Sequence, residues 1–161
     1  MPPAPTGVVG VTQAELSAAH WIARLPEPDR LILDASAIAA QMAGRPLRIL
    51  HVSSGAARHA YQGWSIYCAT KAALDQHAKA VALDGDPDVR ICAIAPGVVD
   101  TDMQTEVRAL PAEQFPLRER FIKMKNEGTL TPAAVAAEKV VDYLLSDAFV
   151  TAPVADIREL R

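Results

Sequence analysis

The sequence predicts an α/β fold in which parallel strands alternate with helices. Two apolar runs, residues 48–53 and 89–95, have the composition of buried strands. Between them, residues 65–83 contain several alanines, which give a helix a smooth surface. Pro96 and Gly97 then break the second run, because proline lacks an amide donor and glycine permits unusual backbone angles. This order predicts an open parallel sheet, which binds ligands at the carboxyl ends of its strands.

Further elements are expected along the rest of the chain. Residues 84–87, Asp-Gly-Asp-Pro, form a loop signal after the helix. Thr131 before Pro132 predicts an N-cap and a first helical position, and hence a helix that ends near Leu145. The apolar residues at about 155–157 predict the last strand.

The amino-terminal segment differs from the rest. Thr12-Gln-Ala-Glu15 fits a capping box, which predicts a helix to about Arg24. A second helix is expected over 31–42, because a glycine and a proline follow it. The chain is therefore divided into an atypical helical segment, 1–45, and an α/β part, 46–161.

Composition limits the possible functions. A chain of 161 residues with 50% apolar residues supports one domain with a real core. The net charge of −3 and the pI near 5.8 argue against a nucleic-acid partner. No apolar run reaches the roughly 18 residues that predict a membrane span. Cys68 and Cys92 are expected to be small buried thiols in a reducing cytoplasm. No metal site is expected, since ligand spacing is absent from the four histidines, His20, His51, His59 and His77.

Three polar side chains predict a proton-transfer site. Tyr67 lies thirteen residues after Ser54, and Lys71 lies four residues after Tyr67. A free phenol has a pKa of about 10, so an isolated tyrosine is a poor acid or base at neutral pH. An ammonium one helical turn away favours the phenolate and is expected to lower the pKa of Tyr67. Ser54, at the end of a predicted strand, is placed to hold a carbonyl or alcohol oxygen.

This Ser–Tyr–Lys set and the strand before it resemble the short-chain dehydrogenase/reductase family. The resemblance implies that 46–161 is the carboxyl-terminal, catalytic half of a Rossmann-like, doubly wound parallel sheet that is incomplete at the amino terminus. It also implies an NADP-dependent carbonyl reductase with a small-molecule carbonyl substrate, acting as a homodimer in the cytoplasm. Tyr67 would then donate the proton, Lys71 would tune it and hold the cofactor ribose, and Ser54 would orient the carbonyl.

The Pro-Gly turn extends the resemblance. In the family, the backbone after this pair meets the nicotinamide, which implies that role for Val99 and Thr101. The charged stretch 106–125 is the implied substrate-covering segment. The whole implied cofactor set is Tyr67, Lys71, Pro96, Gly97, Val99, Thr101, Asp102 and Met103.

Three short motifs narrow the resemblance to the branch of the family that contains the sepiapterin reductases. They are Gly63-Trp64 before the tyrosine, Asp-Thr-Asp-Met-Gln at 100–104, and the spacing from Phe149 to Asp156. A carboxylate can accept paired N–H donors, so Asp156 is the implied anchor of an amino-pyrimidine ring. A solvated acid near the chain end is the equal alternative for Asp156. The implied substrate residues are Ser54, Trp64, Tyr67, Gly97 and Asp156.

Two features of the family are missing from the sequence. A dinucleotide site begins with a strand and a glycine-rich turn that opens a helix. The only candidate, Thr6–Gly10, is expected to be a loop. The active-site asparagine of the family has no counterpart, since the only asparagine is Asn126. Two alternatives therefore stay open: a truncated, catalytically inactive relative, or an interaction protein that uses the family's dimer helices, here about 31–43 and 65–83.

Overall fold

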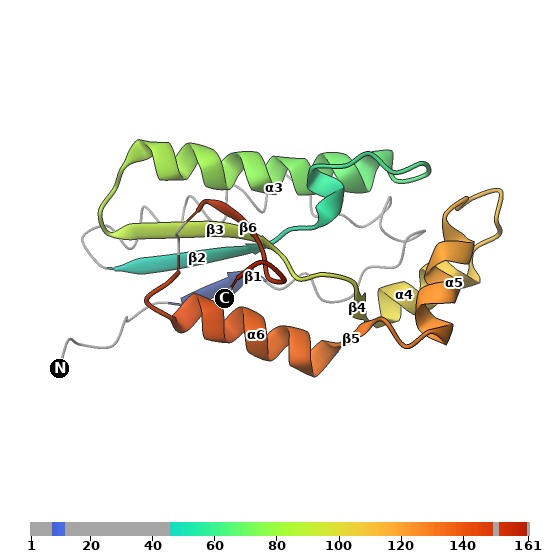
Figure 1. Cartoon of the computed structure of the whole chain (residues 1–161). Helices are drawn as coiled ribbons and strands as arrows, with labels where there is room; N and C mark the ends of the chain where they lie inside the picture. Colours follow the sequence, from blue (N-terminus) through green and yellow to red (C-terminus); the bar gives the residue numbers. More distant parts are fainter. Residues whose placement is uncertain (1–7, 12–45, 150–151, 161) are drawn as a thin grey trace.

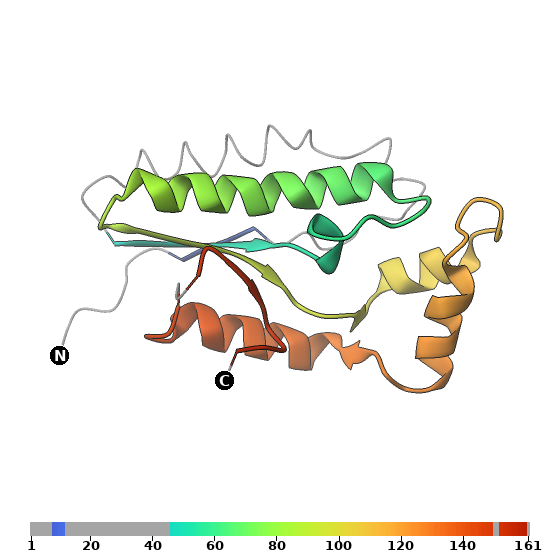
Figure 2. The ribbon, with the colours of Figure 1, turned by 45° about the horizontal axis from the view of Figure 1, so that its top comes forward.

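The computed structural model describes residues 8–11, 46–149 and 152–160. Its centre is a four-stranded parallel sheet in the order β1, β2, β3, β6, formed by Val8–Val11, Leu47–Val52, Val89–Ala95 and Val154–Asp156. Helix α3, Ser65–Asp84, lies along one face of the sheet, and α6, Ala133–Leu145, lies along the other (Figures 1 and 2). The predicted α/β fold with a parallel sheet is confirmed.

Both faces of the sheet are apolar because helices cover its central strands on both sides. Side chains alternate between the two faces along each strand. The buried residues of the α3 layer are Leu47, Ile49, Ala78, Ile91 and Ala93. The buried residues of the α6 layer are Leu50, Cys92, Ile94, Tyr143, Leu144 and Phe149. The sheet therefore has two packed layers. Cys92 is a buried free thiol, as expected, whereas the expectation is wrong for Cys68, whose free thiol is only half-buried.

The carboxyl ends of β2 and β3 lie side by side. Val52 pairs with Ile94, and the next amide, that of Ser53, donates to the Ile94 carbonyl at 2.7 Å. The residues that follow the two strands therefore leave the sheet from the same edge.

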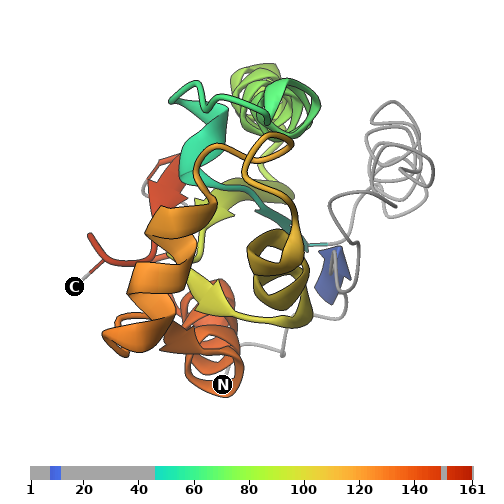
Figure 3. The ribbon, with the colours of Figure 1, turned by 90° about the vertical axis from the view of Figure 1, so that its right-hand side faces the viewer.

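Residues 96–132 leave this edge and return to it, and we call them the 96–132 excursion (Figures 1 and 3). They contain α4, Asp102–Ala109, and α5, Arg118–Asn126. At the base, β4, Val99–Asp100, pairs in parallel with β5, Thr131–Pro132. The excursion has its own small core of Val107, Phe115 and Phe121.

The predicted start of helix α6 is wrong by one residue. Thr131 does not cap α6, because its amide donates to the Val98 carbonyl at 2.9 Å and it forms β5 with Pro132. Pro132 is the N-cap of α6 and makes no side-chain cap bond. Thr131, which the sequence pattern predicted as the N-cap, thus pairs with β4 instead.

The loop expected at Thr6–Gly10 is wrong for residues 8–10. Val8–Val11 forms β1, and Gly10 pairs with Leu50 of β2. Parallel pairing with the buried β2 stabilises an extended backbone there. The helices expected at 12–24 and 31–42 lie outside the described residues, and the division of the chain at residue 45 stays a prediction. Within the described part of the chain, no helix is long and apolar enough to cross a membrane.

Candidate functional site

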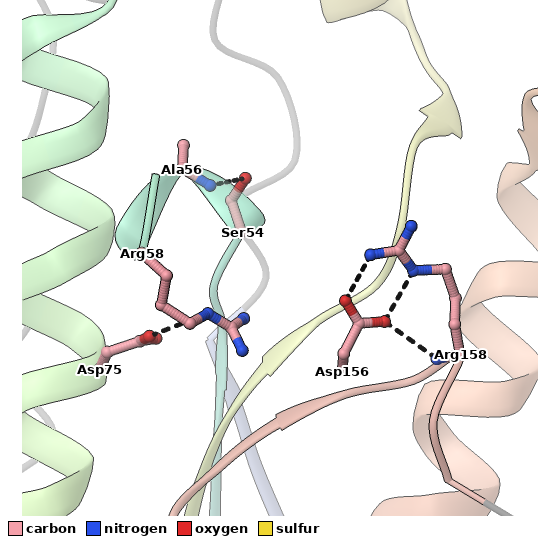
Figure 4. Close-up of polar contacts among 6 residues, drawn as sticks. All are labelled: Ser54, Ala56, Arg58, Asp75, Asp156 and Arg158. Atoms are coloured by element: carbon pink, nitrogen blue, oxygen red, sulfur yellow. Dashed lines mark hydrogen bonds and ion pairs between the residues drawn. The ribbon is translucent and has the colours of Figure 1, made fainter. Parts of the chain in front are cut away.

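The polar residues of the candidate site begin where β2 ends. Ser54 has an extended backbone, with φ −157° and ψ 158°, and caps the 3-10 turn η1, Gly55–Ala57. Its Oγ accepts a hydrogen bond from the Ala56 amide at 3.1 Å (Figure 4). A hydroxyl has one proton and two lone pairs, so this cap leaves further hydrogen-bonding capacity on Ser54.

Tyr67, in the first turn of α3, uses that capacity, since its side chain is hydrogen-bonded to Ser54. The pKa of Tyr67 is raised from its ordinary value of 10.0. Burial is the main cause, because it disfavours the charged phenolate more than the Ser54 hydrogen bond favours it. The lowered pKa expected from the sequence is therefore wrong, since spacing to a lysine does not reveal burial.

Lys71 lies one turn after Tyr67 and is buried. Its Nζ donates to the Val52 carbonyl at 2.8 Å and lies 5.7 Å from the centre of the Tyr67 ring. Burial lowers the pKa of Lys71 to about 8, against the opposing charge of Asp75. The structure thus brings Ser54, Tyr67 and Lys71 together, with an amine that gains and loses a proton close to neutral pH.

Two residues that the sequence analysis did not single out extend this network. Asp75 is 3% exposed and accepts a hydrogen bond from Ser53 Oγ. The Nε atom of Arg58 lies 3.6 Å from Oδ2 of Asp75 (Figure 4). Asp75 had a signal in the sequence, because its i, i+4 spacing from Lys71 places both side chains on one helix face. Arg58 had none.

His51 and His77 form a pair between β2 and α3. The Nε2 atom of His51 lies 2.9 Å from Nδ1 of His77, and His51 is buried. Burial, followed by the charges of His77 and Lys71, lowers the pKa of His51 to about 4. Among the described residues, no group of three His, Cys, Asp or Glu side chains is placed to hold a metal ion.

An aromatic cluster joins the tyrosine to the excursion. The ring centre of Trp64 lies 4.9 Å from that of Tyr67 and 5.0 Å from that of Phe115, on which it stacks. The adjacent Gly63 has φ +80°, a left-handed backbone that favours glycine. Trp64 therefore contacts both Tyr67 and the segment predicted to cover the substrate.

The Pro96–Gly97 turn lies at the carboxyl end of β3. Gly97 has φ +81°, and a Cβ built there would lie 3.6 Å from Cδ of Arg158. The predicted cofactor residues that follow are Val99 in β4, Thr101 before α4, and Asp102 and Met103 in its first turn. Next to them, Oε1 of Gln104 is buried and has no hydrogen-bond partner among the described residues.

Asp156 ends β6 and is 7% exposed. Its two carboxylate oxygens accept hydrogen bonds from Nε and Nη2 of Arg158 at 2.8 and 2.6 Å (Figure 4). These bonds are the main reason why the pKa of Asp156 is lowered. The carboxylate oxygens that were predicted to bind a substrate ring are thus already hydrogen-bonded to Arg158. The substrate role of Asp156 stays a prediction. Arg158 was not predicted from the sequence as its partner.

Known proteins are similar to part of this sequence. A family model described as short chain dehydrogenase matches residues 31–111. A benzil reductase ((S)-benzoin forming) of Bacillus cereus is 37% identical over 115 residues, which are 70% of this chain and 46% of that protein. A sepiapterin reductase of Meriones unguiculatus is 36% identical over 101 residues, 63% of this chain and 38% of that protein. The chain thus spans less than half the length of these curated relatives.

Solved structures share the fold. A short chain dehydrogenase/reductase from Saccharomyces cerevisiae superposes with a TM-score of 0.71 at 25% identity, covering 90% of this chain and 59% of that one. The KRED1-Pglu enzyme superposes with a TM-score of 0.66 at 26% identity, covering 82% of this chain and 59% of that one. With a family model that matches half of its residues, the chain belongs to the short chain dehydrogenase family.

Proposed function

We propose that this chain contains the proton-transfer half of an NADP-dependent carbonyl reductase of the sepiapterin reductase type. The observation that supports this most directly is the hydrogen bond between Tyr67 and Ser54, with Nζ of Lys71 placed 5.7 Å from the tyrosine ring. Membership of the short chain dehydrogenase family supports the reaction class, an oxidation or reduction at a carbonyl or alcohol carbon.

In the proposed reaction a carbonyl becomes an alcohol, so its carbon gains a hydride and its oxygen gains a proton. Ser54 Oγ holds the carbonyl oxygen, and Tyr67 donates its phenolic proton to that oxygen. The raised pKa of Tyr67 keeps the phenol protonated until the substrate oxygen becomes basic. The positive charge of Lys71 then stabilises the phenolate that remains. The nicotinamide supplies the hydride when it is bound.

The described residues fit the nicotinamide end of such a cofactor. Tyr67 and Lys71 would meet its ribose, and the backbone of Val99 and Thr101 would meet its amide group. The buried Oε1 of Gln104, which has no hydrogen-bond partner in the described part of the chain, is an acceptor beside that turn, and buried acceptors without a partner are uncommon. No glycine-rich turn for the pyrophosphate occurs among the described residues, where Gly10 lies inside β1.

The proposed substrates are small carbonyl compounds with a planar ring. Benzil and sepiapterin, for which two relatives are named, are both of this kind. Trp64 offers an aromatic surface 4.9 Å from Tyr67, on which such a ring would stack. Asp156 is the proposed acceptor for N–H donors on the ring, which requires Arg158 to release its carboxylate.

A second candidate function is that of an inactive relative or an interaction protein. Apolar exposure on α3, one of the predicted dimer helices, favours it, since Ile66 and Leu83 are 46% and 87% exposed. A homodimer would bury such side chains. The homodimer and the cytoplasmic location are proposals from the family resemblance.

Titration of the purified chain with NADPH, followed by cofactor fluorescence, separates the two functions. Saturable binding in the micromolar range, with reduction of a dicarbonyl such as benzil, is expected for the reductase. Tyr67→Phe should lower that activity by about 100-fold or more, the usual contribution of a general acid. Tyr143→Phe, on the opposite face of the sheet, is the matched control and should retain activity. No binding at millimolar NADPH would reject the reductase and favour the second function.

A further inference from the structure

Asp75 is a buried carboxylate that the proposed proton transfer does not use. It lies on α3 one turn after Lys71 and is 3% exposed. A carboxylate in such a place costs free energy unless it is paired and hydrogen-bonded. Its Oδ1 atom accepts a hydrogen bond from Ser53 Oγ. Its Oδ2 atom has no hydrogen bond among the described residues and is paired only by charge with Arg58, whose Nε lies 3.6 Å away (Figure 4).

Those two partners lie on either side of Ser54. The Ser53 amide donates to the Ile94 carbonyl at 2.7 Å, so this residue is tied to β3 by its backbone and to α3 by its hydroxyl. Arg58 ends η1, the turn that Ser54 caps. Asp75 therefore holds both ends of the segment 53–58 against the helix that contains Tyr67.

The same carboxylate is also a charge beside Lys71. The charged and titratable groups that act on Lys71 or Asp75 include Tyr67 on α3, His51 on β2, Cys92 on β3 and Arg58 at the end of η1. When Tyr67 is protonated, Asp75 is the one member of this set that is negatively charged at neutral pH. Its charge raises the pKa of Lys71, in opposition to burial.

We propose that Asp75 is a positioning residue of the candidate site, which places Ser54 opposite Tyr67 through Ser53 and Arg58 and serves as the counter-charge of Lys71. Its catalytic meaning rests on the proposed function, whereas the geometry on which it acts does not. A carboxylate that only filled space would be replaceable by its amide without effect on the titration of its neighbours.

The test is Asp75→Asn in the full chain, with the Lys71 amine followed by NMR of 13C-labelled lysine and the Tyr67 phenol by ultraviolet absorbance. Lys71→Met and Tyr67→Phe assign the two signals. The amide keeps an acceptor for Ser53 but loses the charge, so the Lys71 midpoint should fall by about one pH unit, a tenfold loss of proton affinity. Asp142→Asn, at an exposed position of α6, is the matched control and should shift neither midpoint.

A second pair of variants tests the two contacts separately. Arg58→Gln leaves the charge of Asp75 less compensated, so the Lys71 midpoint should rise, opposite in sign to Asp75→Asn. Ser53→Ala removes the hydroxyl contact and should loosen the Ser54 hydrogen bond, so Tyr67 should ionise at higher pH.

Unchanged Lys71 midpoints in folded Asp75→Asn and Arg58→Gln would overturn the proposal. If Asp75→Asn does not fold, the direction of the Arg58→Gln shift decides. None of these readouts requires a cofactor or turnover. The two proposals can fail separately. If the chain does not bind NADPH, but the Lys71 midpoint falls in Asp75→Asn and rises in Arg58→Gln, the reductase is rejected and the positioning role is retained.

Discussion

The sheet with α3 and the 96–132 excursion are held together in different ways. In the first region, Leu47, Ile91 and Ala78 are at most 1% exposed, and a parallel ladder joins β2 to β3 over six residue pairs. In the second, the buried core consists of Val107, Phe115 and Phe121, with partly buried residues around it. The β-structure of the excursion pairs over only two residue pairs, Val99 with Thr131 and Asp100 with Pro132.

The difference in packing matches two roles within the proposed site. The proton-transfer residues Ser54, Tyr67 and Lys71 belong to the region with continuous packing. The segment that would cover a substrate belongs to the region with a small core. Because segments with few buried contacts open at lower free energy than the global core, the excursion is expected to open while the sheet stays folded. Proton transfer, which needs fixed geometry, and covering of the substrate, which needs access, are thus assigned to different regions.

Ile91→Ala should have the largest effect. Ile91 is a residue of β3 that packs in the layer between the sheet and α3 and is 1% exposed. Its truncation therefore leaves a cavity that cannot collapse easily. We expect a loss of about 2–5 kcal/mol in the free energy of unfolding, measured by urea denaturation. Val141→Ala, at a position 48% exposed on α6, is the control and should change it by about 0.5 kcal/mol or less. An equal effect of the two variants would contradict the packing difference.

Acid should weaken the same region through His51. The pKa of His51 is about 4 in the folded chain and 6.5 ordinarily, so the unfolded chain takes up the proton first as the pH falls. Stability present above pH 6.5 is therefore lost progressively down to about pH 4, by up to about 3 kcal/mol. Urea midpoints at a series of pH values test this. The slope should flatten in His51→Gln and persist in exposed His59→Gln. A slope of the same size in both variants would exclude His51 as its source.

Local sequence signals predicted much of the sheet region. Strand β3 begins and ends at the predicted residues, 89–95, because Pro96 and Gly97 stop it by their own backbone chemistry. Helix α3 runs one residue beyond the predicted 65–83, and Gly85 after it has the left-handed φ of +71° that ends helices. The Ser54–Tyr67–Lys71 spacing also predicted that these side chains meet.

Features that depend on tertiary contacts could not be predicted from the sequence. The raised pKa of Tyr67 follows from burial, which spacing along a helix does not reveal. The pairing of Asp156 with Arg158 depends on the turn after β6, and β1 depends on parallel pairing with β2 forty residues away. The sequence therefore predicted that Ser54, Tyr67 and Lys71 meet, but it predicted neither their burial nor these other pairings.

Gly63→Ala should weaken the contact between the two regions. Gly63 has φ +80°, and an added Cβ would lie 3.4 Å from the Gln114 carbonyl oxygen and 3.5 Å from Cδ of Pro116. The left-handed backbone alone costs an alanine about 1–2 kcal/mol. Gly85→Ala is the matched control, since it has φ +71° with its nearest neighbour, Leu83 O, at 3.9 Å. Hydrogen exchange should speed up across the excursion only in Gly63→Ala. Equal exchange in both variants would mean that the excursion does not depend on this contact.

Lys125→Gln should have the smallest effect and should be confined to the excursion. Nζ of Lys125 lies 2.6 Å from Oδ2 of Asp100, so this pair joins the end of α5 to β4, but the two side chains are 49% and 35% exposed. A pair this accessible to water contributes at most about 1 kcal/mol, and salt screens it. We expect amide exchange of the excursion to rise by up to about fivefold at low salt, with little change at 1 M salt. Lys123→Gln, which removes the more exposed pair with Glu127, is the control. Exchange that also rose in β2 and β3 would show that the excursion and the sheet open as one unit, which would remove the distinction between the two regions.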